Sequence, residues 1–277
     1  MEAPGRTGTV RSRDGTVIAF DRSGRGPPLI LVAGALGQRK APYAQQVAAL
    51  LSPHFSVFNY DRRGRGDSGD TSPYTVEREI EDLDALIAEA GGSAYVFGAS
   101  SGAALALEAA ARGSAISRLA VFEPPYMVDP TLHMPAPDRM ERVDELLSAG
   151  RRGDAVEYFF IAVIGVPADI VARMRKAPSW ASFEDIAHTL YYDLVIMSDF
   201  SLPRQLLETV NVPTLVIGGE ESDPRLRKAV QAVAEVLPNA QLRMLEGQAH
   251  GVEPSVLAPV LTDFFVSREP LKRPRAR

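Results

Sequence analysis

The sequence predicts an α/β protein with a doubly wound, mostly parallel sheet and an inserted helical lid. Four continuous apolar runs are typical of strands that are buried on both faces of such a sheet. They alternate with segments whose apolar residues recur at helical spacing, which implies right-handed βαβ crossovers. A proline-rich stretch with helix-like segments, residues 124–210, then interrupts the alternation before it resumes.

The elements follow in order along the chain. Two β-rich runs, TGTVRSRDG and TVIAFDRSG, flank the turn signal Asp14 and Gly15 and predict an opening antiparallel hairpin. The four buried strands are predicted at PLILVAG, FSVFNYD, AYVFGAS and RLAVFEP. The helices among them are predicted at YAQQVAALL, VEREIEDLDALIAEA and GAALALEAAARG. After the interruption come the strand PTLVIGG, the helix PRLRKAVQAVAEVL, the strand QLRMLEG and a closing helix over residues 254–266.

The proline-rich stretch, residues 124–210, determines the domain organisation that we expect. Prolines clustered between Pro124 and Pro137 give it an irregular entry, and MERVDELLSAG and AVEYFFIAVIG predict helices within it. We therefore expect a core, a lid and a basic tail that is disordered. The core comprises residues 1–123 and 211–267, the lid residues 124–210, and the tail residues 268–277.

Composition narrows the class of protein. Of the 277 residues, 45% are hydrophobic and 23% are charged, which predicts a globular chain rather than a disordered one. The net charge of −5 is spread without long acidic runs, so we expect no nucleic-acid partner. The absence of cysteine excludes disulfides, thiolate metal ligands and a cysteine nucleophile. The chain opens without a leader-like segment and has no apolar run of the ~18 residues of a membrane helix, so we expect a cytoplasmic protein.

The stretch AYVFGASSG places Ser100 between a predicted strand and an alanine-rich helix. A nucleophile on such a sharp strand-to-helix turn adopts strained backbone angles and needs small neighbours. Gly98 and Gly102 meet that need. A glycine-rich turn without chemistry would carry the same letters, but the flanking strand and helix favour a nucleophile elbow at Ser100.

Four motifs resemble those of lid-bearing members of the α/β-hydrolase family, and the resemblance extends from the opening hairpin to the last helix. LILVAGALG is similar to the family's strand and oxyanion turn, although Ala33 stands where a histidine is usual, while Gly34 is kept. NYDRRGRGDSG resembles the stretch after the next strand, and VFGASSG resembles the nucleophile elbow. LEGQAHGVEP resembles the closing segment that presents the catalytic histidine.

The resemblance implies a catalytic triad in which Ser100 is the nucleophile and His250 the base, with an oxyanion hole formed by the backbone amides of Ala35 and Ser101. The chemistry of the residues supports this, because a serine hydroxyl needs a base and histidine titrates near neutral pH. His250 lies in a loop after a predicted strand, where such a base is expected. The other histidines are expected at surface or packing positions: His54, His133 and His188.

Two carboxylates compete for the third place in the triad. The family's chain order of serine, acid and histidine directs the choice to Asp223, after PTLVIGG, ahead of Glu220 and Glu221. The turn there is one residue longer than usual, and Asp223 before Pro224 also suits a helix N-cap. The alternative is Glu123 at the end of RLAVFEP, since that strand end points toward the histidine loop in the resembled fold.

The charged loop NYDRRGRGDSG receives a structural interpretation. We expect Asp61 to bind backbone amides, and Arg62, Arg63 and Arg65 to be solvated or paired rather than to bind phosphate. The glycines of this loop do not form a dinucleotide fingerprint, because no helix begins directly at them. No cofactor and no metal are therefore expected.

The implied reaction is cleavage of an ester, lactone or thioester of a small apolar molecule through an acyl-enzyme. Lid residues are expected to line an apolar pocket over Ser100: Tyr158, Phe159, Phe160, Trp180, Tyr191, Tyr192 and Met197. The same fold also hosts lyases and cofactor-free oxidative enzymes, and a catalytically silent ligand-binding protein is a further alternative. Turnover of carbonyl esters would separate the hydrolase from these alternatives.

Overall fold

The structure, a computed structural model, describes residues 5–132 and 134–267. Within these residues, eight strands form one sheet in the order β1-β2-β4-β3-β5-β6-β7-β8. The strands are β1 (Arg6–Arg11), β2 (Val17–Ser23), β3 (Pro28–Val32), β4 (Ser56–Tyr60), β5 (Ala94–Ala99), β6 (Ile116–Phe122), β7 (Thr214–Gly219) and β8 (Ala240–Leu245). The predicted α/β class with a mostly parallel sheet is confirmed.

Strand direction follows the sequence pattern. The β1–β2 hairpin turns at Asp14 and Gly15, and Gly15 adopts the left-handed conformation with φ 88°. β1 and β2 are antiparallel to each other, and β2 is antiparallel to β4, whereas all pairings from β4 through β8 are parallel. Every residue of β4 and β7 is buried, as continuous apolar runs in a covered parallel sheet require.

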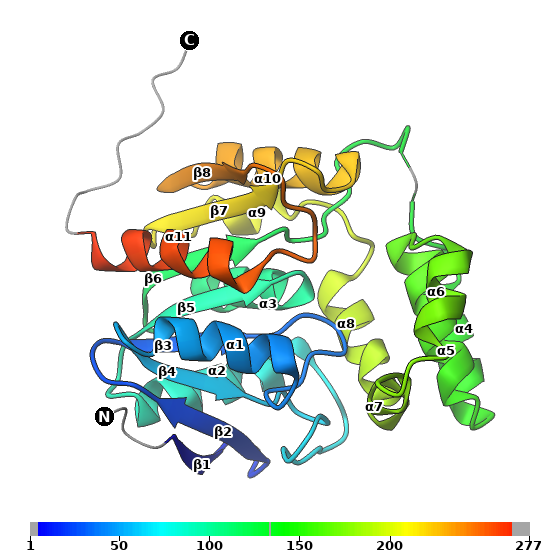
Figure 1. Cartoon of the computed structure of the whole chain (residues 1–277), viewed down its shortest axis with the longest axis horizontal. Coiled ribbons are helices and arrows are strands. Elements are labelled where there is room, and N and C mark those ends of the chain that lie inside the picture. Colours follow the sequence, from blue (N-terminus) through cyan, green and yellow to red (C-terminus); the bar gives the residue numbers. More distant parts are fainter. Residues whose placement is uncertain (1–4, 133, 268–277) are drawn as a thin grey trace.

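Helices cover both faces of the sheet (Figure 1). On one face, α1 (Pro42–Leu51) and α11 (Pro254–Val266) pack on residues such as Leu31, Phe97 and Phe122. The other face is covered by α2 (Val76–Glu89), α3 (Ser101–Ala111) and α10 (Pro224–Val236). This doubly wound arrangement gives the protein one apolar layer on each side of its sheet.

A helical segment joins β6 to β7. Figure 1 shows α4 to α7 beyond the carboxyl ends of the strands, with α8 between them and α3. One turn, Phe159–Ile164, is a π-helix that ends at Gly165 with φ 85°. The helices are α4 (Arg139–Ser148), α5 (Arg152–Tyr158), α6 (Ala168–Met174), α7 (Trp180–Asp185), α8 (Leu190–Met197) and α9 (Arg204–Leu207), with a short 3₁₀ turn, Ala187–Thr189.

The strand order places the ends of β3, β5, β6 and β7 side by side. β3 lies between β4 and β5, and Val32 at the end of β3 pairs with Gly98 near the end of β5. The next strands continue in order, with Phe122 of β6 opposite Ile217 of β7. The sheet therefore reverses its winding at β3 and β5, where open α/β sheets place ligands.

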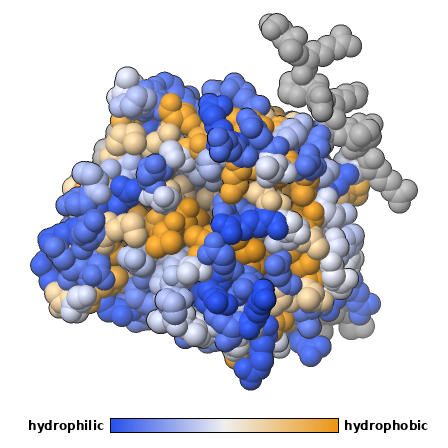
Figure 2. All heavy atoms as spheres, turned by 180° about the vertical axis from the view of Figure 1, so that it is seen from behind, coloured by the Kyte–Doolittle hydropathy of each residue, from blue (hydrophilic) through white to orange (hydrophobic). Residues whose placement is uncertain are grey.

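Apolar side chains reach the surface in patches separated by hydrophilic ones on the face seen in Figure 2. Among the described residues, no helix combines the length and the apolar character needed to cross a membrane. The expected tail, residues 268–277, lies outside the described residues.

Candidate active site

Ser100 lies on a strained turn between β5 and α3. Its backbone angles are φ 54° and ψ −124°, which few residues other than glycine adopt. A Cβ atom at Gly98 would lie 2.4 Å from the carbonyl oxygen of Gly102, and one at Gly102 would lie 2.4 Å from that of Val32. The two flanking glycines are therefore required by close backbone approach, and the turn exposes Ser100 to the pocket described below.

The turn after β3 lies beside Ser100. A Cβ atom at Gly34 would come within 3.0 Å of the Cβ atom of Ser100, so the two turns are in direct contact. Ala35 and Ser101 both line the pocket that contains Ser100. Among the described residues, neither backbone amide donates a hydrogen bond to another turn or to a side chain.

The ring of His250 is paired with the carboxylate of Glu123. Nδ1 of His250 lies 2.6 Å from Oε2 of Glu123, and Oε1 of Glu123 accepts a hydrogen bond of 2.8 Å from the amide of Gly219. Glu123 is fully buried at the end of β6 and has φ 46°. Its two oxygens are thus fixed by neighbouring strand ends, and Nε2 of His250 is left to face the pocket.

Asp223, the acid preferred on sequence grounds, has a different partner. It is the N-cap residue of α10, where Oδ1 accepts hydrogen bonds of 2.8 Å from the backbone amide and 2.9 Å from Nε of Arg225. The carboxylate that the structure pairs with His250 is the alternative, Glu123. The lengthened turn after β7 explains the difference, because it carries Asp223 onto the start of α10 and the end of β6 supplies the acid instead.

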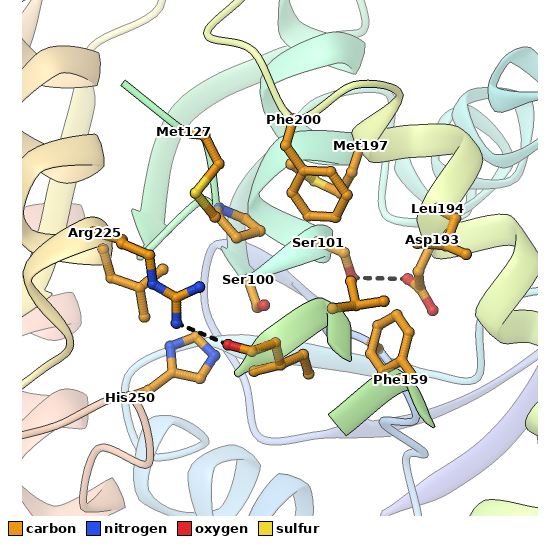
Figure 3. A pocket seen from close by; sticks show the side chains of 15 residues that line it. Ser100, Ser101, Met127, Phe159, Asp193, Leu194, Met197, Phe200, Arg225 and His250 are labelled. Carbon is orange, nitrogen blue, oxygen red and sulfur yellow. Dashed lines mark hydrogen bonds between the residues drawn. The ribbon is translucent and has the colours of Figure 1, made fainter. Parts of the chain in front are cut away.

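The pocket encloses Ser100 and His250 within mostly apolar walls (Figure 3). It holds about 570 Å³ of empty space, its opening to solvent included. In the described part of the chain no hydrogen bond joins Ser100 to His250, a common feature of sites without substrate. The lining residues are Ala35, Ser100, Ser101, Pro125, Met127, Phe159, Val163, Ile164, Asp193, Leu194, Met197, Phe200, Arg225, Leu226 and His250.

The residues expected in the pocket, six aromatic side chains and Met197, divide into two groups. Phe159 and Met197 line it, as expected. The ring of Phe160 instead packs against Trp180 and Phe183, with centroid separations of 6.1 and 5.8 Å. Tyr192 stacks on Tyr74 of the core, 3.9 Å away. Tyr158 and Tyr191 are not among the lining residues, and Tyr191 is 37% exposed.

A buried ionic cluster, formed by Arg62, Arg65, Glu79 and Asp193, contributes Asp193 to the lining of the pocket. Nη1 of Arg62 and Nη2 of Arg65 lie 2.8 and 2.7 Å from the two carboxylate oxygens of Asp193, on α8. Arg62 also binds Glu79, at 2.7 and 2.6 Å. Each of the four side chains is at most 2% exposed. The two positive and two negative charges are thus paired without access to water.

The same cluster contacts both turns of the site. The hydroxyl of Ser101 donates a hydrogen bond of 2.7 Å to Asp193. Arg65 donates to the carbonyl oxygen of Gly34 at 2.6 Å, and Arg62 donates to that of Ala33 at 3.2 Å. Burial raises the pKa of Asp193, but Arg65, Arg62 and the hydrogen bond from Ser101 outweigh it and hold that pKa below its ordinary value.

The charged loop NYDRRGRGDSG contains buried hydrogen bonds and ion pairs. Asp61 accepts hydrogen bonds from the amides of Arg39 and Asp67, at 2.8 and 3.0 Å, as expected. Arg63 is paired with Asp82 and is fully buried, so these arginines are paired rather than solvated. The described residues contain no cluster of three or more histidine or acidic side chains suited to a metal ion.

The remaining histidines lie away from Ser100. His188 has its ring 3.6 Å from Asp70, and His54 precedes β4 beside Phe55. Neither lines the pocket. His133 lies outside the described residues.

Asp193 and Arg225 are the two charged pocket residues that the sequence analysis missed. The available signal for Asp193 is one acidic residue within the apolar run LYYDLVIM. Arg225 carries a weaker signal, because it follows a helix cap and resembles any exposed arginine in a first helical turn.

Several known proteins are similar to this chain. Residues 9–260 match the model of a family described as the alpha/beta hydrolase family. A solved alpha/beta hydrolase from Sphaerobacter thermophilus DSM 20745 is 54% identical and has a TM-score of 0.90, covering 93% of this chain and 100% of its own. The esterase RhEst1 from Rhodococcus sp. ECU1013 shares the fold, with 21% identity, a TM-score of 0.70 and coverage of 94% and 98%. A non-heme chloroperoxidase from Kitasatospora aureofaciens is 27% identical over 87% of this chain and 91% of its own.

Proposed function

Because the chain belongs to the alpha/beta hydrolase family, we propose that it is a cofactor-free serine hydrolase that cleaves an ester-type bond of a small molecule. One observation carries the proposal. Ser100, on a strained elbow, shares a pocket with His250, whose ring is paired with the buried Glu123. A nucleophile, a base and a group that orients the base are the parts that acyl transfer requires.

The reaction proceeds through an acyl-enzyme. Oγ of Ser100 attacks the substrate carbonyl carbon while Nε2 of His250 takes the hydroxyl proton. The developing oxyanion accepts hydrogen bonds from the amides of Ala35 and Ser101. Collapse of the intermediate breaks the bond to the leaving alcohol, which takes the proton from His250. Water then attacks the acyl group by the same proton transfers, and the product acid leaves.

Glu123 is the acid of the proposed triad. Its 2.6 Å contact with Nδ1 fixes the tautomer in which Nδ1 carries the proton and Nε2 accepts one from Ser100. Burial keeps water from competing for this carboxylate, and the Gly219 amide holds its second oxygen. The negative charge stabilises the imidazolium that forms during attack.

Residues 124–210 form the lid of this proposal, inserted between core segments 1–123 and 211–267. Its π-helix contributes Phe159, Val163 and Ile164 to the pocket, and α8 contributes Leu194 and Met197. These apolar walls favour a substrate with apolar groups near the scissile bond.

A labelling experiment tests the nucleophile. The wild-type protein is treated with a fluorophosphonate and analysed by intact mass and peptide mapping, while hydrolysis of ethyl butanoate is followed in parallel. We expect one label, at Ser100, and loss of label and turnover in Ser100→Ala. Ser101→Ala, which changes the adjacent hydroxyl, is the matched control and should still be labelled at Ser100. Equal labelling of a folded Ser100→Ala protein would refute the elbow assignment.

A second candidate is peroxide-dependent oxidation, favoured by the similarity to a non-heme chloroperoxidase. Hydrogen peroxide could replace water as the attacker of the acyl-enzyme, which would release a peracid and restore Ser100. Halogenation of monochlorodimedone in acetate, hydrogen peroxide and bromide measures this route. Bromination that is lost in Ser100→Ala supports it, whereas ester hydrolysis without bromination restricts the protein to the first function.

A further inference from the structure

Arg225 places a positive charge at the wall of the pocket. It is the second residue of α10, it is 8% exposed, and it lines the same pocket as Ser100 and His250. Figure 3 shows its guanidinium with one nitrogen turned toward the side of the pocket where Ser100 lies. Most other lining side chains are apolar, so this cation is conspicuous in its surroundings.

The hydrogen bonds of Arg225 leave part of the guanidinium unused. An arginine side chain offers five N–H donors. Nε donates to Asp223, and Nη2 donates to the carbonyl oxygen of Ile164 at 2.8 Å and to Asp223 at 3.1 Å. Nη1 is buried and has no hydrogen-bond partner in the described part of the chain. Both of its N–H groups therefore lack an acceptor within the described residues.

The guanidinium is held in place rather than free to find other partners. Asp223 binds one edge of it, and the backbone at Ile164 binds another nitrogen. Gly165 makes room for it, since a Cβ atom there would lie 2.9 Å from Nη2. A buried donor that is fixed in position and unpaired is costly unless a bound molecule satisfies it.

The charges around the pocket are paired, so the position of the donors on Arg225 decides which group binds beside it. The carboxylate of Asp193 is neutralised by Arg62 and Arg65, so it does not repel an anion. Asp223 is 42% exposed and therefore screened by water, whereas the Arg225 side chain is only 9% exposed. A substrate group beside Nη1 thus meets two N–H donors of a buried guanidinium whose other edge is paired with Asp223. A carboxylate is the group whose oxygens match such donors best.

We infer that the substrate carries a carboxylate in addition to its scissile ester bond, and that Arg225 binds this carboxylate through Nη1. The inference rests on the proposed esterase function and specifies its substrate class. Asp223, through its contacts with Nε and Nη2, is the residue that positions the guanidinium.

Paired substrates test this specificity. One series carries the charge in the acyl half: the monoethyl esters of succinic, glutaric and adipic acid, compared with ethyl butanoate, pentanoate and hexanoate. The other carries it in the alcohol half: 4-acetoxybutanoate and 5-acetoxypentanoate, compared with butyl and pentyl acetate. The members of each pair differ only in a carboxylate that replaces a methyl group. Initial rates are measured in a pH-stat at pH 7.5.

For at least one pair we expect the carboxylate ester to have a kcat/KM about 10- to 100-fold above that of its uncharged match, as charge-assisted hydrogen bonds predict. Arg225→Gln should abolish this ratio, mainly through KM, and Arg225→Lys should preserve part of it. Lys228→Gln is the matched control, because it removes a charge from the exposed side of the same helix. It should leave the ratio unchanged.

The outcomes separate the inference from the proposed function. Equal turnover of charged and uncharged esters by the wild type overturns the inference while the esterase stands. The inference is also overturned if the kcat/KM ratio between charged and uncharged esters survives in a folded Arg225→Gln protein and only the melting temperature falls. Arg225 then has only a structural role. If no ester is turned over, the proposed function fails. The inference is then decided by calorimetric titration of monoethyl glutarate into Ser100→Ala, with and without Arg225→Gln, where equal binding overturns it.

Discussion

The hydroxyl of Ser101 donates a hydrogen bond of 2.7 Å to the carboxylate of Asp193, a residue 92 positions later in the chain. Ser101 follows the proposed nucleophile at the start of α3, and Asp193 lies on α8 between β6 and β7. Arg62 and Arg65 bind the same carboxylate and the carbonyl groups of the turn after β3. One buried carboxylate therefore joins the helical segment, the turn at Ser100 and the turn after β3.

Removing the charge of Asp193 should destabilise the protein strongly. In Asp193→Asn the shape of the side chain is kept, but Arg62 and Arg65 lose the carboxylate that they share and only Glu79 remains to balance them. Breaking a buried ion pair in this way costs about 3–5 kcal/mol. Urea unfolding should report this loss in the free energy of unfolding. Asp169→Asn, in an exposed pair with Arg173, is the control and should change little. A stable Asp193→Asn protein would show that the cluster does not hold the fold together.

The stability of the protein should depend on Asp193 in acid. Burial raises the pKa of this carboxyl, but Arg65 and Arg62 bring it below the ordinary value of 3.8. The unfolded chain therefore takes up the proton first as the pH falls, and the folded state loses stability from 3.8 downward until its own, lower pKa is passed. The difference in unfolding free energy between the wild type and Asp193→Asn should be complete at pH 7. It should shrink as the pH falls below 3.8. A constant difference down to pH 3 would contradict the assignment.

Local patterns predicted the fold and the strained turn at Ser100 because their causes are local. Burial on both faces favours a continuous apolar run in a parallel strand, as at residues 215–217 of β7, and the close approach at Gly98 and Gly102 leaves room only for glycine. The position of His250 after β8 followed from a motif of the same kind. The buried strand, the glycine turn and the histidine motif are each encoded within ten residues of sequence.

The carboxylate partner of His250 and the charged pocket residues were not predictable in this way because their contacts depend on distant parts of the chain. Glu123 reaches His250 across 127 positions, and Asp193 reaches Arg65 across 128. The sequence shows Asp223 only as a carboxylate in a turn, which suits a helix cap and a triad equally. The geometry that separates these roles arises from the order of β6, β7 and β8 in the sheet.

Exchanging carboxylates for amides tests the acid of the proposed triad. Glu123→Gln removes the charge that stabilises the imidazolium and lets the ring adopt the wrong tautomer, so turnover of ethyl butanoate should fall on the order of 10⁴-fold. Asp223→Asn keeps an N-cap side chain, so turnover of this uncharged ester should remain near that of the wild type. Circular dichroism and melting temperatures check that both variants are folded. The reverse pattern, with Asp223→Asn inactive and Glu123→Gln active, would return the acid to Asp223.

Two adjacent phenylalanines test whether the helical segment sets substrate size. Phe159 lines the pocket, whereas Phe160 packs against Trp180 and Phe183 within the segment. Phe159→Ala should enlarge the pocket and shift the preference among ethyl esters from acetate to octanoate toward longer chains, because each methylene that gains a contact contributes about 1–3 kcal/mol to discrimination.

Phe160→Ala is the matched control for that substitution, since it deletes the same ring one position along the chain. We expect it to lower the melting temperature while leaving the order of preferred chain lengths as in the wild type, because its ring does not face the substrate. Profiles are compared as ratios of kcat/KM within each variant, so a loss of folded protein cancels. If both variants shift the chain-length profile equally, the helical segment acts through its overall packing. If neither variant shifts the profile, Phe159 does not contact the acyl chain of the substrate.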